Sequence, residues 1–146
     1  MTQPTPRGLR NCNPGNIRIS ATKYQGEIQP SRDPAFKQFE SMAYGYRAIF
    51  MLLHTYAARH GLDTIRGMIS RYAPTNENDT AKYIRAVSDW SFTAPDTHLT
   101  TTNAEVMIPI VSAISRYENG RTAVASDVQE GWRMFIRSIR KTNARM

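Results

Sequence analysis

The chain has 146 residues, a length that fits a single domain, 1–146, with a hydrophobic core of its own. Hydrophobic residues make up 40% of the sequence and aromatic residues 10%, which is typical of a folded globular protein and argues against a disordered chain. Cys12 is the one cysteine, so neither an internal disulfide nor a cysteine-based zinc site is expected. We expect no secretory signal, because the first residues lack an apolar stretch, and the longest apolar run, AIFMLL, is too short to span a bilayer.

The net charge of +7 is concentrated at the two ends of the sequence. Residues 1–26 contain four basic residues and no acidic one, and residues 131–146 contain five basic residues and no acidic one. If the two ends lie together, as domain termini often do, one face of the protein is strongly positive. Such a face suits an anionic partner such as a bacterial envelope, a membrane surface or a nucleic acid. A basic surface without any dedicated partner is the simpler alternative.

The N-terminal third predicts a small irregular β hairpin or sheet. The segments NIRIS and FKQFE and the residues around Glu27 alternate in strand-like fashion, and the loop-forming PSRDPA separates two of them. In the preceding motif, NPGN, Pro14 and Gly15 predict the centre of a type II turn, with Gly15 at a positive φ.

Apolar residues recur at helical spacing along the rest of the chain. Ser41 is expected to cap a buried central helix whose apolar residues nearly surround its middle: Met42, Tyr46, Ile49, Phe50, Leu53 and Tyr56. Asp63 is expected to cap a second helix, which ends at Ala73 and Pro74. Asn78 or Asp79 is expected to open a third helix, whose inward-facing residues are Tyr83, Ile84, Val87 and Trp90.

Two longer helices are expected after the polar loop TAPDTHLTTTN. The first contains Pro109, either near its start or at a kink, and ends at Gly120. The last is expected to begin at Ser126, with Gln129 in the capping-box position, and to bury Val128, Trp132, Phe135, Ile136 and Ile139. The predicted fold class is therefore mainly α, as an α+β domain with a minor β part.

Several kinds of active site have no counterpart in the sequence. The three histidines show no metal-ligand spacing, there is no phosphate-binding loop, and no G-x-S-x-G motif is present. We therefore expect no metal and no cofactor.

Glu118 is the acidic residue with the most unusual predicted environment. It lies four residues after Ile114 and seven after Val111, so it extends an apolar stripe in the last helical turn before Gly120. Burial and the negative end of the helix dipole both raise the pKa of a carboxyl group. A carboxyl that keeps its proton near neutral pH is what a glycosidase needs as its general acid. The simpler alternative is a helix-end glutamate that reaches solvent beside a neighbouring arginine.

Four stretches carry a resemblance to a known family: RGLRNCNPGNIR, FKQFESMAYGYRAI, DTIRGMISRYAPTNENDTAKYIRAV and ISRYENG. They resemble phage virion and endolysin-like proteins with an R-N-x-N-P-G-N-I-R opening and an A-P-x-x-E-N-x-T-x-x-Y-I block. The resemblance extends from about Arg7 to Gly120. Some members of this family are structural proteins, and others are lysozyme-like or transglycosylase-like.

A looser resemblance links the chain to lytic transglycosylases and goose-type lysozymes. AISRYENG is similar to their catalytic-glutamate block, NPGNIR to their amide-bearing turn, and RYAPTNENDTAKYIRAV to their tyrosine block. The glutamate block comes last here instead of first, so the resemblance implies a circularly permuted lysozyme-like fold. A permuted order requires the turn at Asn13 to Asn16 to lie beside Glu118.

These resemblances imply a peptidoglycan-cleaving glycosidase, either a muramidase or a lytic transglycosylase. Glu118 would act alone as general acid and base on the glycan strand of N-acetylmuramic acid and N-acetylglucosamine, because no second carboxylate is evident for a two-carboxylate mechanism. The residues implied in substrate binding are Asn13, Asn16, Tyr72, Asn76 and Tyr83. The two asparagines would bond N-acetyl groups or hold the turn against the glutamate helix, and the tyrosines would line the sugar groove or simply pack in the core.

Two other functions remain open from the sequence. The first is a non-catalytic phage virion protein with a lysozyme-like fold, and the second is a basic nucleic-acid-binding virion protein. Nucleic acid is the less favoured partner, because the aromatic residues recur at core spacing. For the enzyme, we expect peptidoglycan as substrate, the anionic envelope as a surface held by the basic ends, and virion proteins as further partners.

The sequence also leaves open how the protein reaches its substrate. We expect synthesis in the host cytoplasm and action on the cell wall after lysis, holin-type release or virion delivery. Whether Asp79, Glu77 or Glu40 assists Glu118, and which oligomer forms, stays open.

Overall fold

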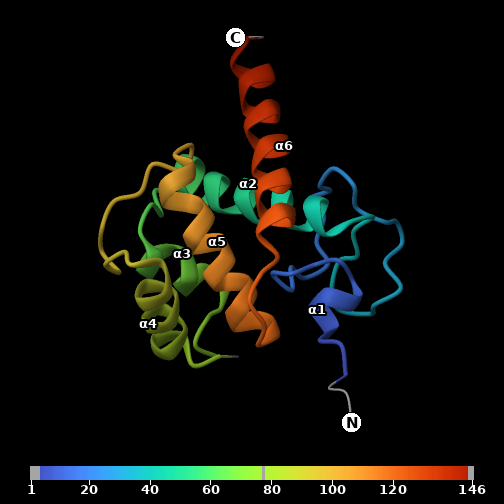
Figure 1. Ribbon diagram of the computed structural model, residues 1–146, viewed down its shortest axis with the longest axis horizontal. Coiled ribbons are helices and arrows are strands. Elements are labelled where there is room, and N and C mark those ends of the chain that lie inside the picture. The colour runs from blue at the N-terminus through green and yellow to red at the C-terminus, as the bar shows by residue number, and fades with distance from the viewer. Residues whose placement is uncertain (1–3, 77, 145–146) are drawn as a thin grey trace.

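The computed structural model describes residues 4–76 and 78–144, and these residues are mainly helical (Figure 1). The mainly α class predicted from the sequence is therefore confirmed. The helices are α1 (Arg7–Arg10), α2 (Met42–His60), α3 (Ile65–Tyr72), α4 (Thr80–Ser91), α5 (Ala104–Asn119) and α6 (Ala125–Ala144).

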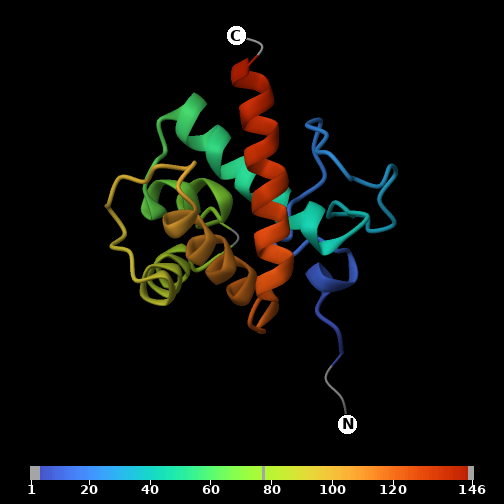
Figure 2. The same cartoon turned by 45° about the horizontal axis from the view of Figure 1, so that its top comes forward.

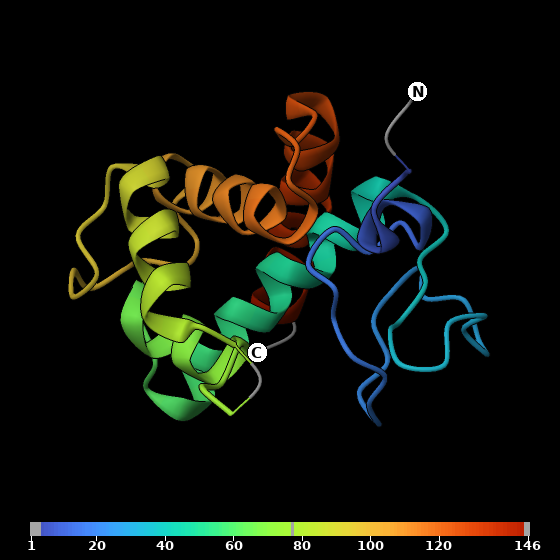
Figure 3. The ribbon, with the colours of Figure 1, turned by 90° about the horizontal axis from the view of Figure 1, so that it is seen from below.

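Helix α2 is the buried central helix that the sequence predicted. The Ser41 hydroxyl caps it by accepting a hydrogen bond from the backbone N–H of Tyr44 at 3.3 Å. Ile49, Phe50 and Leu53 in its middle have no more than 1% of their surface exposed. Viewed from below, α2 runs between the N-terminal segment and the group formed by α3, α4 and α5 (Figure 3). The helix thus connects the two parts of the molecule that contribute the candidate site.

Helix α6 crosses α2 and extends beyond the rest of the molecule (Figure 2). Gly131 makes this crossing close, because a Cβ atom there would lie 2.7 Å from Cβ of Tyr46 and 2.9 Å from the carbonyl oxygen of Ala43. On the same face, the Phe50 ring packs edge-on against Trp132, with ring centroids 5.0 Å apart, and stacks on Phe135 at 5.9 Å. The predicted apolar face of the last helix is thus the face that packs on α2.

The N-terminal segment corrects the prediction of a β hairpin or sheet. Among the described residues it contains no strand, and its only β pairing consists of two isolated antiparallel bridges, Arg18 with Phe36 and Glu27 with Phe39. Short runs of backbone hydrogen bonds and a buried side chain hold this segment together. The N–H of Lys37 bonds to the carbonyl of Ile17 at 2.9 Å, and the N–H of Ile28 bonds to the carbonyl of Gln38 at 2.7 Å. The Nζ of Lys37, which is fully buried, donates to Oε1 of Glu27 at 2.9 Å and to the carbonyl of Thr22 at 2.8 Å.

Two predicted helix starts are each displaced by one residue. Thr64, not Asp63, caps α3, because its hydroxyl accepts the N–H of Gly67 at 3.0 Å, while Asp63 instead contacts His98 Nδ1 at 2.9 Å. Helix α6 begins at Ala125, not at Ser126. Asp79 does cap α4, since its carboxylate accepts the N–H of Lys82 at 3.1 Å.

Of three predictions for α4 and α5, the one for Trp90 is wrong, and those for Pro109 and Gly120 agree with the structure. Trp90 does not face inward: it is 36% exposed, and the guanidinium of Arg116 lies over its ring at 4.0 Å from the centroid. Pro109 lies inside α5, and Gly120 ends that helix in a left-handed conformation with φ 68°, as expected. A tryptophan at the edge of the core is accommodated because the cation covers part of its apolar face.

The two basic stretches of the sequence are separated only in part. Helix α1 and the C-terminal part of α6 lie at opposite ends of the molecule in Figures 1 and 2. Gln25, at the end of the first basic stretch, nevertheless lines a pocket together with Arg137 and Lys141 of α6. None of the helices in the described residues is both long enough and apolar enough to cross a membrane.

Candidate active site

The motif RNCNPGNIR forms a compact turn built around the side chain of Asn13. Asn13 is fully buried, its amide nitrogen donates to the carbonyls of Ile17 and Lys37 at 2.9 Å each, and its amide oxygen accepts the N–H of Ile17 at 3.0 Å. These bonds tie the turn to the backbone at Lys37, so Asn13 holds the N-terminal segment together. The bond to the helix of Glu118, one of the two roles foreseen for the asparagines, is made by Asn16.

The turn at Pro14 and Gly15 is not the predicted type II turn. The N–H of Asn16 bonds to the carbonyl of Asn13 at 3.0 Å, but the residue with a positive φ is Asn16 at 49°, not Gly15. Gly15 is required for space instead. A Cβ atom there would lie 2.2 Å from the hydroxyl of Tyr72 and 2.9 Å from Cγ1 of Ile49. The close approach of α2 and α3 to the turn therefore explains the glycine.

The side chain of Asn16 reaches the last turn of α5 and bonds to Glu118. Its Nδ2 donates to Oε1 of Glu118 at 2.8 Å, and the hydroxyl of Tyr83 donates to Oε2 at 2.7 Å. Glu118 is half-buried. Burial raises its pKa above the ordinary value, and the hydrogen bonds from Asn16 and Tyr83 lower it by less. The predicted proximity of the turn to Glu118, and the predicted upward shift of its pKa, are both confirmed.

Two of the predicted tyrosines belong to this cluster. Tyr83 is 1% exposed, its ring stacks on that of Tyr117 at 3.9 Å between centroids, and burial raises its pKa well above the ordinary value. The hydroxyl of Tyr72 donates to the carbonyl of Gly15. Burial also raises the pKa of Tyr72 strongly, so both phenols remain protonated donors.

Asn119 is a site residue that the sequence analysis did not identify. Its Nδ2 donates to the carbonyl of Pro14 at 2.8 Å and to the carbonyl of Ser115 at 2.9 Å. It is 7% exposed, and its neighbour Glu118 faces the cleft. Its position in the sequence, as an amide side chain next to Glu118 in the final helical turn, is the signal by which it could have been found.

Glu118 opens into a cleft of about 340 Å³ between the N-terminal segment and helices α2 and α3. We call it the Glu118 cleft. It is lined by Gly15, Asn16, Ile17, Arg18, Ser20, Thr22, Tyr24, Phe36, Leu52, Tyr56, Tyr72, Ala73, Asn78 and Glu118. Of the described residues, Glu118 is the only acidic one that lines it. The mixture of aromatic faces, hydroxyls and amides can bind a polar ring compound and present one carboxyl group to it.

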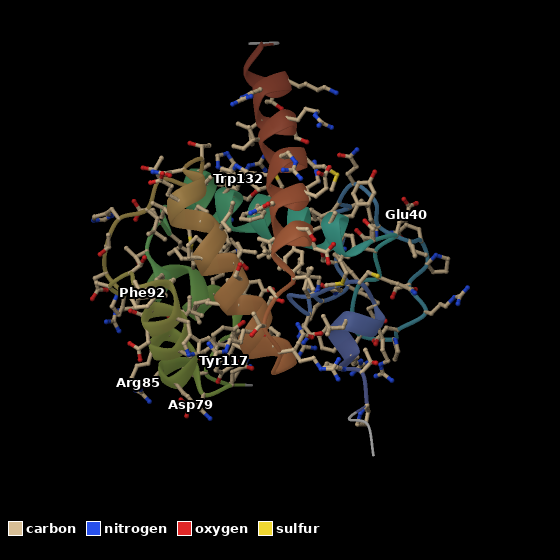
Figure 4. The ribbon with its side chains drawn as sticks, in the orientation of Figure 1. Glu40, Asp79, Arg85, Phe92, Tyr117 and Trp132 are labelled. Carbon is tan, nitrogen blue, oxygen red and sulfur yellow. The ribbon has the colours of Figure 1, made fainter. Side chains whose placement is uncertain are left out.

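The other candidate residues lie away from the carboxyl group. Asn76 is exposed in the loop between α3 and α4, where Asn78 lines the cleft instead. The carboxylate of Asp79 is used as the cap of α4. Glu40 lies on the opposite side of the molecule from Tyr117 and Asp79 (Figure 4). Glu77 lies outside the described residues. The structure thus brings Asn16, Tyr72 and Tyr83 together around Glu118.

No metal site is evident in the described part of the chain, where no three histidine, cysteine, aspartate or glutamate side chains gather. The site therefore offers one carboxyl group, the guanidinium of Arg18, hydroxyls and amides as its chemical groups. Such a set suits proton transfer and hydrogen bonding to a polar substrate.

Comparison with known proteins gives one relative of this chain and no matching protein-family model. Protein P5 of Pseudoalteromonas phage PM2 is 37% identical over 124 residues, which cover 83% of this chain and 76% of the phage protein. A phage relative of this extent supports a bacteriophage origin. The chain therefore belongs to the same family as protein P5 of Pseudoalteromonas phage PM2.

Proposed function

We propose that the protein is a peptidoglycan-cleaving glycosidase of phage type, with Glu118 as its single general acid and base. The observation that carries the proposal is the environment of the Glu118 carboxyl group. It is half-buried at the end of α5, faces a cleft of about 340 Å³, and has a raised pKa, so that it holds its proton more tightly than an exposed glutamate does.

The chemistry follows from these positions. Glu118 protonates the glycosidic oxygen between N-acetylmuramic acid and N-acetylglucosamine as the bond from this oxygen to the anomeric carbon breaks. A water molecule, or the 6-hydroxyl of the same muramic acid residue, then bonds to that carbon and gives its proton to the Glu118 carboxylate. Asn16 and Tyr83 each donate to one carboxylate oxygen, so they fix the orientation of the carboxyl and stabilise the anion that remains after proton transfer. Tyr56 and Tyr24 line the cleft and offer aromatic faces to pyranose rings.

A single-acid route is the version that the cleft supports. The other acids considered, Asp79 and Glu40, are a helix cap and a residue on the far side of the molecule. The proposal includes a lysozyme-like fold in circularly permuted order, supported by the hydrogen bond from the N-terminal turn to the C-terminal glutamate block. It also includes action on the wall after lysis, holin-type release or delivery with the virion.

The direct test is clearance of a cell-wall suspension by the wild type and by Glu118→Gln. We expect the variant to lose about 10²- to 10⁴-fold in rate, the usual contribution of a general acid. Glu40→Gln makes the same change of charge at an exposed position and should clear walls at the wild-type rate. Mass analysis of the products separates a transglycosylase, which leaves a 1,6-anhydro end, from a hydrolase, which leaves a reducing end. A fully active Glu118→Gln protein would contradict the assignment.

A second candidate is a non-catalytic virion protein that retains the fold. It is favoured by the observation that both carboxylate oxygens of Glu118 are hydrogen-bonded, as expected of a group that ties α4, α5 and the turn together. In that case Glu118→Gln leaves the biological function unchanged and no glycan product is formed.

A further inference from the structure

A second cleft adjoins the Glu118 cleft on the side of α2. Its volume is about 440 Å³, and it is lined by Thr22, Lys23, Tyr24, Gln25, Arg47, Met51, Leu52, Thr55, Tyr56, Arg59, His60 and Arg71. We call it the basic cleft. Thr22, Tyr24, Leu52 and Tyr56 line both clefts, so the two clefts are immediate neighbours.

The side chains of the basic cleft are positive or neutral. Lys23, Arg47, Arg59 and Arg71 contribute four positive charges, and none of its described lining residues is acidic. The nearby carboxylate of Glu27 is bonded to buried Lys37 at 2.9 Å, and it also accepts the backbone N–H of Tyr24 at 3.0 Å. Glu27 therefore compensates Lys37 and leaves the basic cleft with an excess of positive charge.

Two arginines of the cleft are held by neighbouring side chains. Arg47 is 7% exposed, and its Nη2 donates to the hydroxyl of Ser138 at 3.0 Å. The guanidinium of Arg71 lies over the ring of Tyr56 at 5.3 Å from the centroid. Arg59 and Lys23 are exposed and complete the rim.

We propose that the basic cleft binds carboxylate groups on the peptides that branch from a glycan strand whose backbone lies in the Glu118 cleft. This inference rests on the proposed function and assigns it a substrate feature, a glycan that carries acidic substituents. The two adjoining clefts differ in charge: one holds a single acid, Glu118, and a single cation, Arg18, whereas the other holds four cations and no acid among its described lining residues. This difference matches a sugar backbone with anionic branches. The positive side chains would then select the position of the strand in addition to attracting it.

The test measures retention on insoluble cell walls from which phosphate polymers have been removed with hydrofluoric acid. The full chain carries Glu118→Gln, so that cleavage does not alter the walls. One batch of walls is left untreated, and in another the carboxylates are capped as amides with ethanolamine and a carbodiimide. Lys23→Gln with Arg59→Gln removes two exposed cations of the basic cleft. Arg10→Gln with Arg85→Gln removes two exposed cations elsewhere, and Arg85 points outward from α4 in Figure 4.

We expect the cleft variant to bind untreated walls about three- to tenfold more weakly than its parent, and to bind capped walls as its parent does. The control variant should match the parent on both. Equal loss on untreated and capped walls, or no loss, overturns the inference. So does a loss confined to retention on DNA, which assigns the cleft to nucleic acid.

These outcomes are separable from failure of the proposed function. If the wild type does not clear walls while the carboxylate-dependent difference persists, the basic cleft binds the substituents and the glycosidase proposal fails. If the wild type clears walls and capping changes nothing, the glycosidase proposal holds and this inference alone is overturned.

Discussion

The amide of Asn16 and the carboxyl of Glu118 are joined by a hydrogen bond of 2.8 Å although 102 positions separate them in the chain. A second tie runs in parallel, from Asn119 to the carbonyl of Pro14 at 2.8 Å. Together they fix the N-terminal turn against the last turn of α5. The N-terminal turn, which is distant from Glu118 in the sequence, therefore helps to set the direction in which the Glu118 carboxyl points.

Folding stability should report the raised pKa of Glu118. Because burial raises that pKa in the folded state above its ordinary value of 4.5, the folded protein holds this proton more tightly than the unfolded chain. The stabilising contribution of Glu118 is complete below the unfolded pKa and is lost as pH rises through the folded pKa. Glu118→Gln removes this titration, so the free energy of unfolding of the variant should gain on that of the wild type as the pH rises above the ordinary value of 4.5 and through the folded-state pKa.

Urea unfolding of both proteins at several pH values above 4.5 measures the difference in their free energies of unfolding. The readout is the change of this difference with pH, because the substitution also changes hydrogen bonds by an amount that does not depend on pH. The raised pKa would be contradicted if the free energy of unfolding of the variant, relative to that of the wild type, stayed constant or fell as the pH rises.

Tyr83→Phe should move the activity profile of the proposed enzyme toward higher pH. The hydroxyl of Tyr83 donates to Oε2 of Glu118 at 2.7 Å, and this bond lowers the pKa of the carboxyl. Without it the pKa rises further, so the limb of the profile on which the acid loses its proton shifts upward. The measurement is the rate of wall clearance at low substrate as a function of pH.

Tyr46→Phe is the matched control for this experiment. It also removes a buried phenol hydroxyl, which shares a hydrogen bond of 2.8 Å with Ser115, but it does not touch Glu118. We expect a loss of about 1 kcal/mol in stability and an unchanged profile. The interpretation fails if both variants shift the profile equally.

Gly15→Ala should destabilise the fold by about 1–3 kcal/mol through overpacking. The added methyl group would lie 2.2 Å from the hydroxyl of Tyr72 and 2.9 Å from Ile49. If this contact is the cause, Tyr72→Phe removes one of the two clashing atoms, and Gly15→Ala should cost less in that background. A double-mutant cycle of unfolding free energies gives the coupling, and strict additivity would rule out the clash.

Glu27→Gln should cost about 3–5 kcal/mol, because it leaves the charge of Lys37 buried without a counterion. The Lys37 side chain is fully buried, and its Nζ lies 2.9 Å from Oε1 of Glu27. Asp96→Asn breaks a pair of similar geometry with Arg66, at 2.7 Å, but both partners are exposed. That control should cost less than about 1 kcal/mol. Similar losses from the two substitutions, measured by denaturant unfolding, would show that burial does not govern the Glu27 pair.

The helices could largely be predicted from the sequence, because their signals are local. The cap at Ser41, the cap at Asp79 and the stop at Gly120 follow from a few neighbouring residues. The prediction of Asp63 as the cap of α3 was wrong, because the neighbouring Thr64 can also accept a helix N–H and His98, from another segment, contacts Asp63. Gly15 was assigned to a turn conformation, since the contact with Tyr72 that requires it is not visible in a local pattern.

The sequence by itself determined the mainly helical class, the apolar face of each main helix, and Glu118 as an acid in an apolar stripe, because periodicity and caps act over a few residues. Only the tertiary structure decided what surrounds that acid. The donors Asn16 and Tyr83, the adjoining basic cleft, and the separation of α1 from the C-terminal part of α6 all depend on how the helices pack. Those contacts join distant segments, and their geometry follows from helix packing and not from local spacing.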